Sequence, residues 1–184
     1  MRRLLWLTAL AAVVAGAFLY VNETNPPWYE RLRYPLHYAE YVRVHAREHG
    51  LDPALVAAVI YQESKFDPEA RSSSGAIGLM QVTPHTAKGI AIRTGGHAFR
   101  TSDLYNPEIN IRYGAWYLDN LFKKYGSERL VLAAYNAGQG NVDSWLAAHE
   151  GIQFGETRAY VERVEDLTSI YRRAWHSQLY PAAG

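Results

Sequence analysis

Apolar residues recur at helical spacing along most of the chain beyond residue 37. The pattern predicts helices over residues 37–49 and 53–65, a short one opened by Thr83 and Pro84, and further ones over 106–126, 127–137 and from about 156. The glycine-containing stretch from Gly89 to Tyr105 interrupts the pattern and is interpreted as a flexible surface loop. No run of alternating apolar and polar residues predicts a strand, so the predicted fold class is all-α, with one compact domain.

The N-terminus is a continuous apolar segment behind two arginines. Arg2 and Arg3 precede the run from Leu4 to Val21, about 18 residues, which is near the lower limit for spanning a bilayer. A signal peptide cleaved after Ala15-Gly16-Ala17 is the alternative. Because the apolar run continues past that point, an uncleaved anchor in the cytoplasmic membrane is favoured. Both interpretations predict an extracytoplasmic domain in the cell envelope.

These patterns divide the chain into segments of different character. Residues 1–21 are predicted to be a membrane anchor or signal segment, and residues 22–36 a polar, proline-rich tether. Residues 37–176 form the folded domain, and residues 177–184 a C-terminal tail. The formal net charge is only +1, so nothing indicates nucleic acid as a partner. The absence of cysteine excludes a disulfide framework and a cysteine-based zinc site.

One carboxylate lies at an unusual place in the helical pattern. Glu63 follows Val59 by four residues and Ile60 by three, so it continues the apolar face of its helix. Loss of hydration and the negative end of the helix dipole both disfavour the ionised form there, so a raised pKa is predicted. A raised pKa suits a general acid that works near neutral pH. The alternative is a glutamate that reaches solvent from the edge of the apolar face.

Short segments along the chain carry a more specific signal. They are Glu63-Ser64-x-Phe66, Ser72-Ser73-Ser74-Gly75-Ala76-Ile77-Gly78-Leu79-Met80-Gln81, Ala134-Tyr135-Asn136-Ala137-Gly138 and Glu156-Thr157-x-x-Tyr160-Val161. In this order and spacing they resemble the catalytic domain of the soluble-lytic-transglycosylase (SLT) family, relatives of goose-type lysozyme. The resemblance covers about residues 41–171. It implies a lysozyme-like catalytic domain within residues 37–176 that acts on the glycan strands of peptidoglycan.

The resemblance also implies roles for individual residues. Glu63 would be the sole catalytic acid and base: it protonates the oxygen between N-acetylmuramic acid and N-acetylglucosamine, then accepts the proton of the C6 hydroxyl as a 1,6-anhydro ring closes. No cofactor or metal is implied. The hydroxyls of Ser72 and Ser74 would lie near the catalytic carboxyl, and Tyr160 would direct its hydroxyl at it. The implied substrate-binding residues are Ser72, Ser74, Met80, Gln81, Tyr135, Asn136 and Tyr160.

Other functions remain open at this point. His45-Ala46-Arg47-Glu48-His49 matches the H-x-x-E-H pattern of zinc metallopeptidases, although no third ligand is evident and a mixed-charge surface helix is preferred. A lysozyme-type muramidase would hydrolyse the same bond with water. An inactive peptidoglycan-binding module is the third alternative, and the intact Glu63 argues against it. The sequence indicates membrane contact through the N-terminal helix, and it leaves protein partners unknown.

Overall fold

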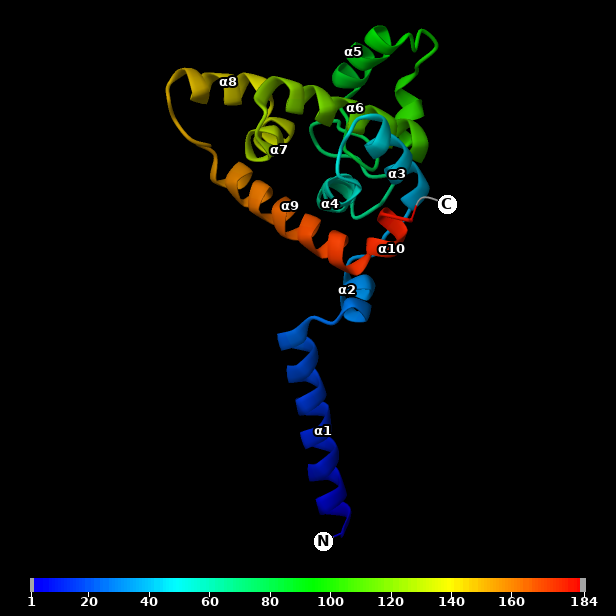
Figure 1. Cartoon of the computed structure of the whole chain (residues 1–184), viewed down its shortest axis with the longest axis vertical. Coiled ribbons are helices and arrows are strands. Elements are labelled where there is room, and N and C mark those ends of the chain that lie inside the picture. Colours follow the sequence, from blue (N-terminus) through cyan, green and yellow to red (C-terminus); the bar gives the residue numbers. More distant parts are fainter. Residues whose placement is uncertain (1, 183–184) are drawn as a thin grey trace. The chain divides into compact units, whose positions relative to one another are not determined.

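The computed structural model describes residues 2–182 (Figure 1). At residues 2–5, 8, 9, 12 and 22 it describes only the backbone. The chain separates into two compact units, residues 1–35 and residues 36–184. Residue 1 of the predicted anchor and residues 183–184 of the predicted tail lie outside the described residues. Each unit is considered by itself.

The N-terminal unit contains two helices, α1 (Arg2–Thr24) and α2 (Pro27–Arg33). Pro27 occupies the first turn of α2, a position that requires no backbone donor. The segment predicted as a proline-rich tether is therefore largely helical rather than extended. Across the described residues, no helix combines the length and apolarity that crossing a membrane requires. The anchor within residues 1–21 stays a prediction.

The second unit is built from helices and turns. They are α3 (Ala39–Glu48), α4 (Pro53–Ser64), α5 (Pro84–Thr94), the 3₁₀ helix η1 (Thr101–Tyr105), α6 (Pro107–Tyr125), α7 (Glu128–Ala137), α8 (Gln139–Ala147), α9 (Gly155–Ala174) and α10 (His176–Leu179). Within residues 2–182 no strand forms, and the only β pairing is in the isolated bridges Arg71–Ile77 and Ile77–Val82. This confirms the predicted all-α class.

Capping residues fix where the main helices begin. The Asp52 carboxylate accepts a hydrogen bond from the Ala54 N–H at the start of α4 (2.9 Å). The Asn106 side chain accepts one from Ile109 at the start of α6 (3.2 Å). Both helices then carry proline in the first turn, as the sequence predicts.

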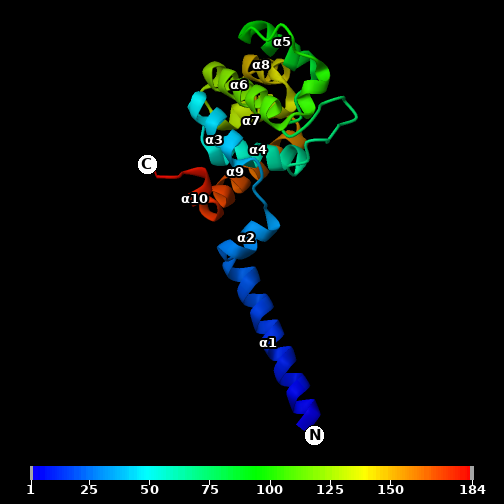
Figure 2. The same ribbon diagram turned by 90° about the vertical axis from the view of Figure 1, so that its right-hand side faces the viewer.

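Helix α4 is the centre of the second unit. Every residue from Ala54 to Ile60 is at most 1 % exposed, and α4 packs against α9 and α3. The prediction of a single apolar face was too narrow, because a helix that is apolar all round can be enclosed on every side. In Figures 1 and 2, α5 and α9 lie at opposite ends of this unit, with α6, α7 and α4 between them.

Two further expectations need correction, and one helix was missed. The stretch from Gly89 to Tyr105 is not one flexible loop, because α5 continues through Gly89 to Thr94 and η1 follows. A single glycine weakens a helix but does not end it. Helix α8 was not predicted at all. Part of the predicted C-terminal tail belongs to the folded unit, since Leu179 is buried and the Tyr180 hydroxyl bonds the Asp52 carboxylate.

Candidate active site

The carboxyl group of Glu63 lies in the last turn of α4, next to the N-terminal half of α9. The buried Tyr160 hydroxyl donates a hydrogen bond to Glu63 Oε1 at 2.7 Å. Helices α4 and α9 pack against each other. The predicted contact between Tyr160 and Glu63 is therefore present, although 97 residues separate the two positions. One carboxyl oxygen is held, and Oε2 is left for other partners.

Burial raises the pKa of Glu63 to about 7 from its usual value of 4.5. The Tyr160 hydrogen bond and the positive charge of Lys65 act in the opposite direction, because both favour the carboxylate, but their combined effect is smaller. The direction agrees with the prediction from sequence. The acid is thus protonated in part of the molecules at neutral pH and can both give and take a proton.

A buried asparagine supports the loop that follows α4, residues 65–83. Asn110, on α6, is fully buried and accepts a hydrogen bond from the Met80 N–H at 2.8 Å. Its amide group also donates to the carbonyls of Ile77 (2.9 Å) and Leu104 (2.8 Å). A Cβ on Gly78, whose φ is +76°, would lie 2.4 Å from both the Asn110 amide and the Leu104 carbonyl. The loop can therefore pack this closely on α6 because Asn110 bonds its backbone and because Gly78 has no Cβ.

Met80 lies in the core of the unit. It is fully buried, and its sulfur occupies the space that a Cβ on Gly114 would need, at 2.2 Å. The core encloses the side chain in this position, and the predicted sugar contact stays a prediction. Because a methionine side chain adapts to irregular gaps, it fills the space over Gly114 on α6. Its carbonyl oxygen accepts a hydrogen bond from the Tyr135 hydroxyl (2.7 Å).

Two other predicted binding residues, Gln81 and Asn136, make polar contacts within the domain. The Gln81 amide donates to the carbonyls of Gly78 (2.9 Å) and Ala70 (3.2 Å), and Gln81 has a φ of +47°. Its amide nitrogen is thus used within the loop. Asn136 is exposed, and its side-chain oxygen accepts a hydrogen bond from Thr157 on α9 (2.8 Å). Asn136 therefore joins the end of α7 to the start of α9.

The serines belong to a turn. The Ser72 and Ser74 hydroxyls lie 2.9 Å apart, and Ser72 Oγ accepts a hydrogen bond from the Ala76 N–H (3.0 Å). Ser74 is exposed and Ser72 partly so. The prediction that these hydroxyls orient the reacting groups at Glu63 stays a prediction.

Sequence reasoning gave no role to two residues that shape this site, although Ser64 is part of the Glu63-Ser64 motif. Asn110 is the first. Ser64, next to Glu63, is the second: its hydroxyl donates to the Leu79 carbonyl at 2.8 Å and so ties the end of α4 to the loop. A signal was available for Asn110, because it lies between Ile109 and Ile111 on a helix whose neighbouring positions are apolar. Its three backbone partners could not be read from spacing.

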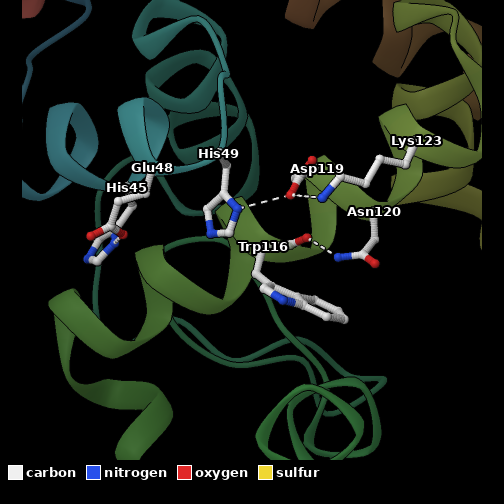
Figure 3. A network of polar contacts seen from close by, with 7 residues as sticks. All are labelled: His45, Glu48, His49, Trp116, Asp119, Asn120 and Lys123. Atoms are coloured by element: carbon white, nitrogen blue, oxygen red, sulfur yellow. Dashed lines mark hydrogen bonds and ion pairs between the residues drawn. The ribbon is translucent and has the colours of Figure 1, made fainter. Parts of the chain in front are cut away.

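The residues of the H-x-x-E-H match have separate partners. His45 bonds Glu48 through Nδ1 (2.7 Å) and Glu108 through Nε2 (3.2 Å). His49 instead bonds Asp119, which also accepts a hydrogen bond from Lys123 (Figure 3). Among the described residues, no group of three or more histidine, aspartate or glutamate side chains could hold a metal ion. These contacts do not favour the zinc-peptidase alternative.

Comparison with known proteins points to the same function as the motifs. A family model described as the transglycosylase SLT domain matches residues 40–154. The soluble lytic murein transglycosylase of Salmonella typhimurium is 35 % identical over 152 residues, which cover 76 % of this chain and 24 % of that protein. The membrane-bound lytic murein transglycosylase C of Histophilus somni is 39 % identical over 115 residues, covering 57 % of this chain and 32 % of that protein.

A solved structure extends the likeness to three dimensions. The structure of an inactive mutant of the lytic transglycosylase Slt from Pseudomonas aeruginosa superposes with a TM-score of 0.74 and 35 % sequence identity. The superposition covers 80 % of this chain and 26 % of that chain. The chain thus spans about a quarter of the length of the soluble relative and of this solved structure.

Proposed function

Since the chain belongs to the transglycosylase SLT domain family, we propose that it is a peptidoglycan lytic transglycosylase. It cleaves the β-1,4 bond between N-acetylmuramic acid and N-acetylglucosamine and leaves 1,6-anhydro-N-acetylmuramic acid ends. The observation that carries the proposal is the partly buried Glu63 carboxyl group, whose pKa is raised to about 7 and which Tyr160 holds at the end of α4.

In the proposed mechanism Glu63 acts twice. Its protonated form gives a proton to the glycosidic oxygen as the bond from that oxygen to C1 breaks, and the substrate's 2-acetamido oxygen stabilises C1. The Glu63 carboxylate then takes the proton of the C6 hydroxyl as that oxygen bonds C1 and closes the ring. Because Tyr160 occupies Oε1, Oε2 is the oxygen for both transfers. The enzyme ends in its starting protonation state, and no water is added.

The electrostatic surroundings of Glu63 support a mechanism with a single carboxyl group. Ordinary glycosidases use two carboxyl groups, one as acid and one as base or nucleophile. Among the described residues, the groups that shift the pKa of Glu63 are Tyr160 and Lys65, and neither is a carboxylate. With the acetamido group as nucleophile and the C6 hydroxyl in the place of water, the second carboxyl group is not needed.

The products of cleavage test the proposed reaction. Digestion of purified sacculi by the full chain is expected to release muropeptides that are one water lighter than hydrolytic products, because ring closure replaces hydrolysis. Mass spectrometry distinguishes the two product classes. Release of reducing muramic acid ends instead would identify a lysozyme-type muramidase, and absence of any cleavage would favour the inactive binding module.

We propose further that the domain works outside the cytoplasm and that residues 4–21 attach it to the cytoplasmic membrane. The supporting observations are the apolar sequence behind Arg2 and Arg3 and a relative whose name describes it as membrane-bound. After cell fractionation, the full chain is expected in the membrane pellet, and salt washing should not release it. A variant lacking residues 1–21 serves as the control. If expression of the full chain instead gave a shortened protein in the soluble fraction, this result would favour a cleaved signal peptide.

A further inference from the structure

A cavity of about 740 Å³ opens between α5, α6 and α8. Its wall combines the flat rings of Trp116 and Tyr117 with polar and basic side chains from all three helices. The residues that matter here are His85, Arg93, Trp116, Tyr117, Asn120 and Lys124. Aromatic rings beside hydrogen-bonding groups are typical of a ligand site rather than of a packing defect.

The charge of this wall is of one sign. Three side chains that carry or can acquire positive charge line the cavity, and no carboxylate is among its lining residues. Helix α5 contains no acidic residue at all. The whole chain is nearly neutral, with 19 basic residues against 18 acidic ones, so the local excess does not follow from overall basicity. Such a wall attracts anionic groups.

Arg93 is the cation best placed to bind an anion. Its Nη1 donates to the Gly89 carbonyl at 3.0 Å, and a Cβ on Gly89 would lie 3.1 Å from the same nitrogen. The glycine therefore lets the guanidinium group lie close against α5. Within residues 2–182, no carboxylate pairs with Arg93. The remaining guanidinium donors can meet a carboxylate in the planar geometry that this group prefers.

Lys124 lines the cavity from α6. Its ammonium group donates to Asp143 (2.7 Å) and to Gln139 (3.0 Å), both on α8. An ammonium group has three donors, so one is left beyond these two contacts. Lys124 is thus held in place by α8, with its charge partly compensated, and its contribution should be smaller than that of Arg93.

The cavity is linked to the catalytic carboxyl group through a pair of tyrosines. The Tyr117 ring lies 5.5 Å from the Tyr135 ring, measured between centroids, and the Tyr135 hydroxyl bonds the carbonyl of Met80. Burial, and after it the charge of Glu63, raises the pKa of Tyr135 well above its usual value. Ser64, the residue after Glu63, donates a hydrogen bond to the carbonyl of Leu79, the residue before Met80 (2.8 Å), so a polymer bound at Glu63 can reach the cavity with a neighbouring part.

We propose that this cavity binds a free carboxylate of a peptide stem attached to the glycan, with Arg93 as its main partner and Lys124 and His85 in support. The inference rests on the proposed function, because only a peptidoglycan substrate carries such stems beside the scissile bond. Trp116 and Asn120 then offer a ring face and an amide to the adjoining sugar or peptide groups. The cavity would make the enzyme prefer strands with acidic stems.

The test compares native sacculi with sacculi whose stem carboxylates have been converted to primary amides. The measured quantity is the ratio of the rates at which anhydro products are released from the two. The full chain is expected to favour native sacculi by about tenfold, the effect of one charge-assisted contact. Arg93→Gln should bring the ratio to about one, and Lys124→Gln should lower it by a smaller factor.

Lys123→Gln is the matched control. It removes the same charge from the adjacent position of α6, but Lys123 is directed to Asp119 in the contact network of His49 and does not line the cavity (Figure 3). This variant should keep the preference of the full chain. Equal rates on both substrates for the unaltered chain, or an undiminished preference in Arg93→Gln, would overturn the inference. No anhydro products from native sacculi would instead contradict the proposed function itself.

Discussion

Glu63→Gln is expected to lower the rate of glycan cleavage by about 10³-fold or more, because the amide can neither give a proton to the glycosidic oxygen nor take one from the C6 hydroxyl. The substitution keeps the shape of the side chain, and the amide oxygen can still accept the Tyr160 hydrogen bond. Binding of glycan strands should therefore survive. The measurements are product release from sacculi and co-sedimentation of the variant with them.

The same substitution should stabilise the fold at alkaline pH. Folding raises the pKa of Glu63 from 4.5 to about 7, so the stability linked to its proton is fully present below pH 4.5 and is lost as the pH rises through 7. A neutral glutamine avoids the burial of a charged carboxylate. Above pH 7 it should therefore increase the free energy of unfolding by up to about 3 kcal/mol relative to the unaltered chain. Thermal unfolding at pH 5 and pH 8 should show a difference from the unaltered chain mainly at pH 8.

A surface glutamate provides the control for Glu63→Gln. Glu162 is exposed on α9, two residues beyond Tyr160, and Glu162→Gln should leave both the cleavage rate and the pH dependence of stability unchanged. If Glu63→Gln released products as fast as the unaltered chain, Glu63 would not be the acid. If the stability of Glu63→Gln differed from that of the unaltered chain by the same amount at pH 5 and at pH 8, the pKa of Glu63 would not be raised.

Local chemistry made much of the fold predictable from the sequence. Asp52 before Pro53 and Asn106 before Pro107 each combine a side-chain cap with a residue suited to the first turn, so α4 and α6 begin where expected. The position of Gly89 misled the prediction, since α5 tolerates it inside the helix. There the packing of α5 on α6 supplies stability that local propensity does not express.

The site was predictable where it depends on motifs and not where it depends on packing. The contact between Glu63 and Tyr160 followed from a resemblance, because 97 residues of separation give no local signal. The resemblance implied a substrate-binding role for Met80, but it gave no sign that the missing Cβ of Gly114 opens a space in the core that the Met80 side chain fills. A gap of this kind arises only when two distant segments meet, so spacing along the chain cannot reveal it.

Asn110→Ala is expected to destabilise the second unit by about 3–4 kcal/mol and to lower its unfolding temperature by about 10 °C. The substitution leaves the Met80 N–H and the carbonyls of Ile77 and Leu104 without their side-chain partner in the interior. Each buried polar group left unpaired costs about 1–3 kcal/mol, and water can relieve only part of it. Urea and thermal unfolding of the purified chain measure the loss.

The effect of Asn110→Ala should extend to catalysis because the same loop carries Met80. When the Met80 N–H loses its hydrogen bond to Asn110, the Met80 carbonyl is no longer held in position to accept the hydrogen bond of the Tyr135 hydroxyl. Cleavage should therefore fall even at temperatures where the variant stays folded. Asn141→Ala is the matched control: Asn141 is exposed on α8, its amide donates to the carbonyl of Ala137 (2.8 Å), and its loss should cost under about 1 kcal/mol. Equal stability of the two variants would show that the three buried contacts do not hold the loop, and full activity of a folded Asn110→Ala would separate the loop from the reaction.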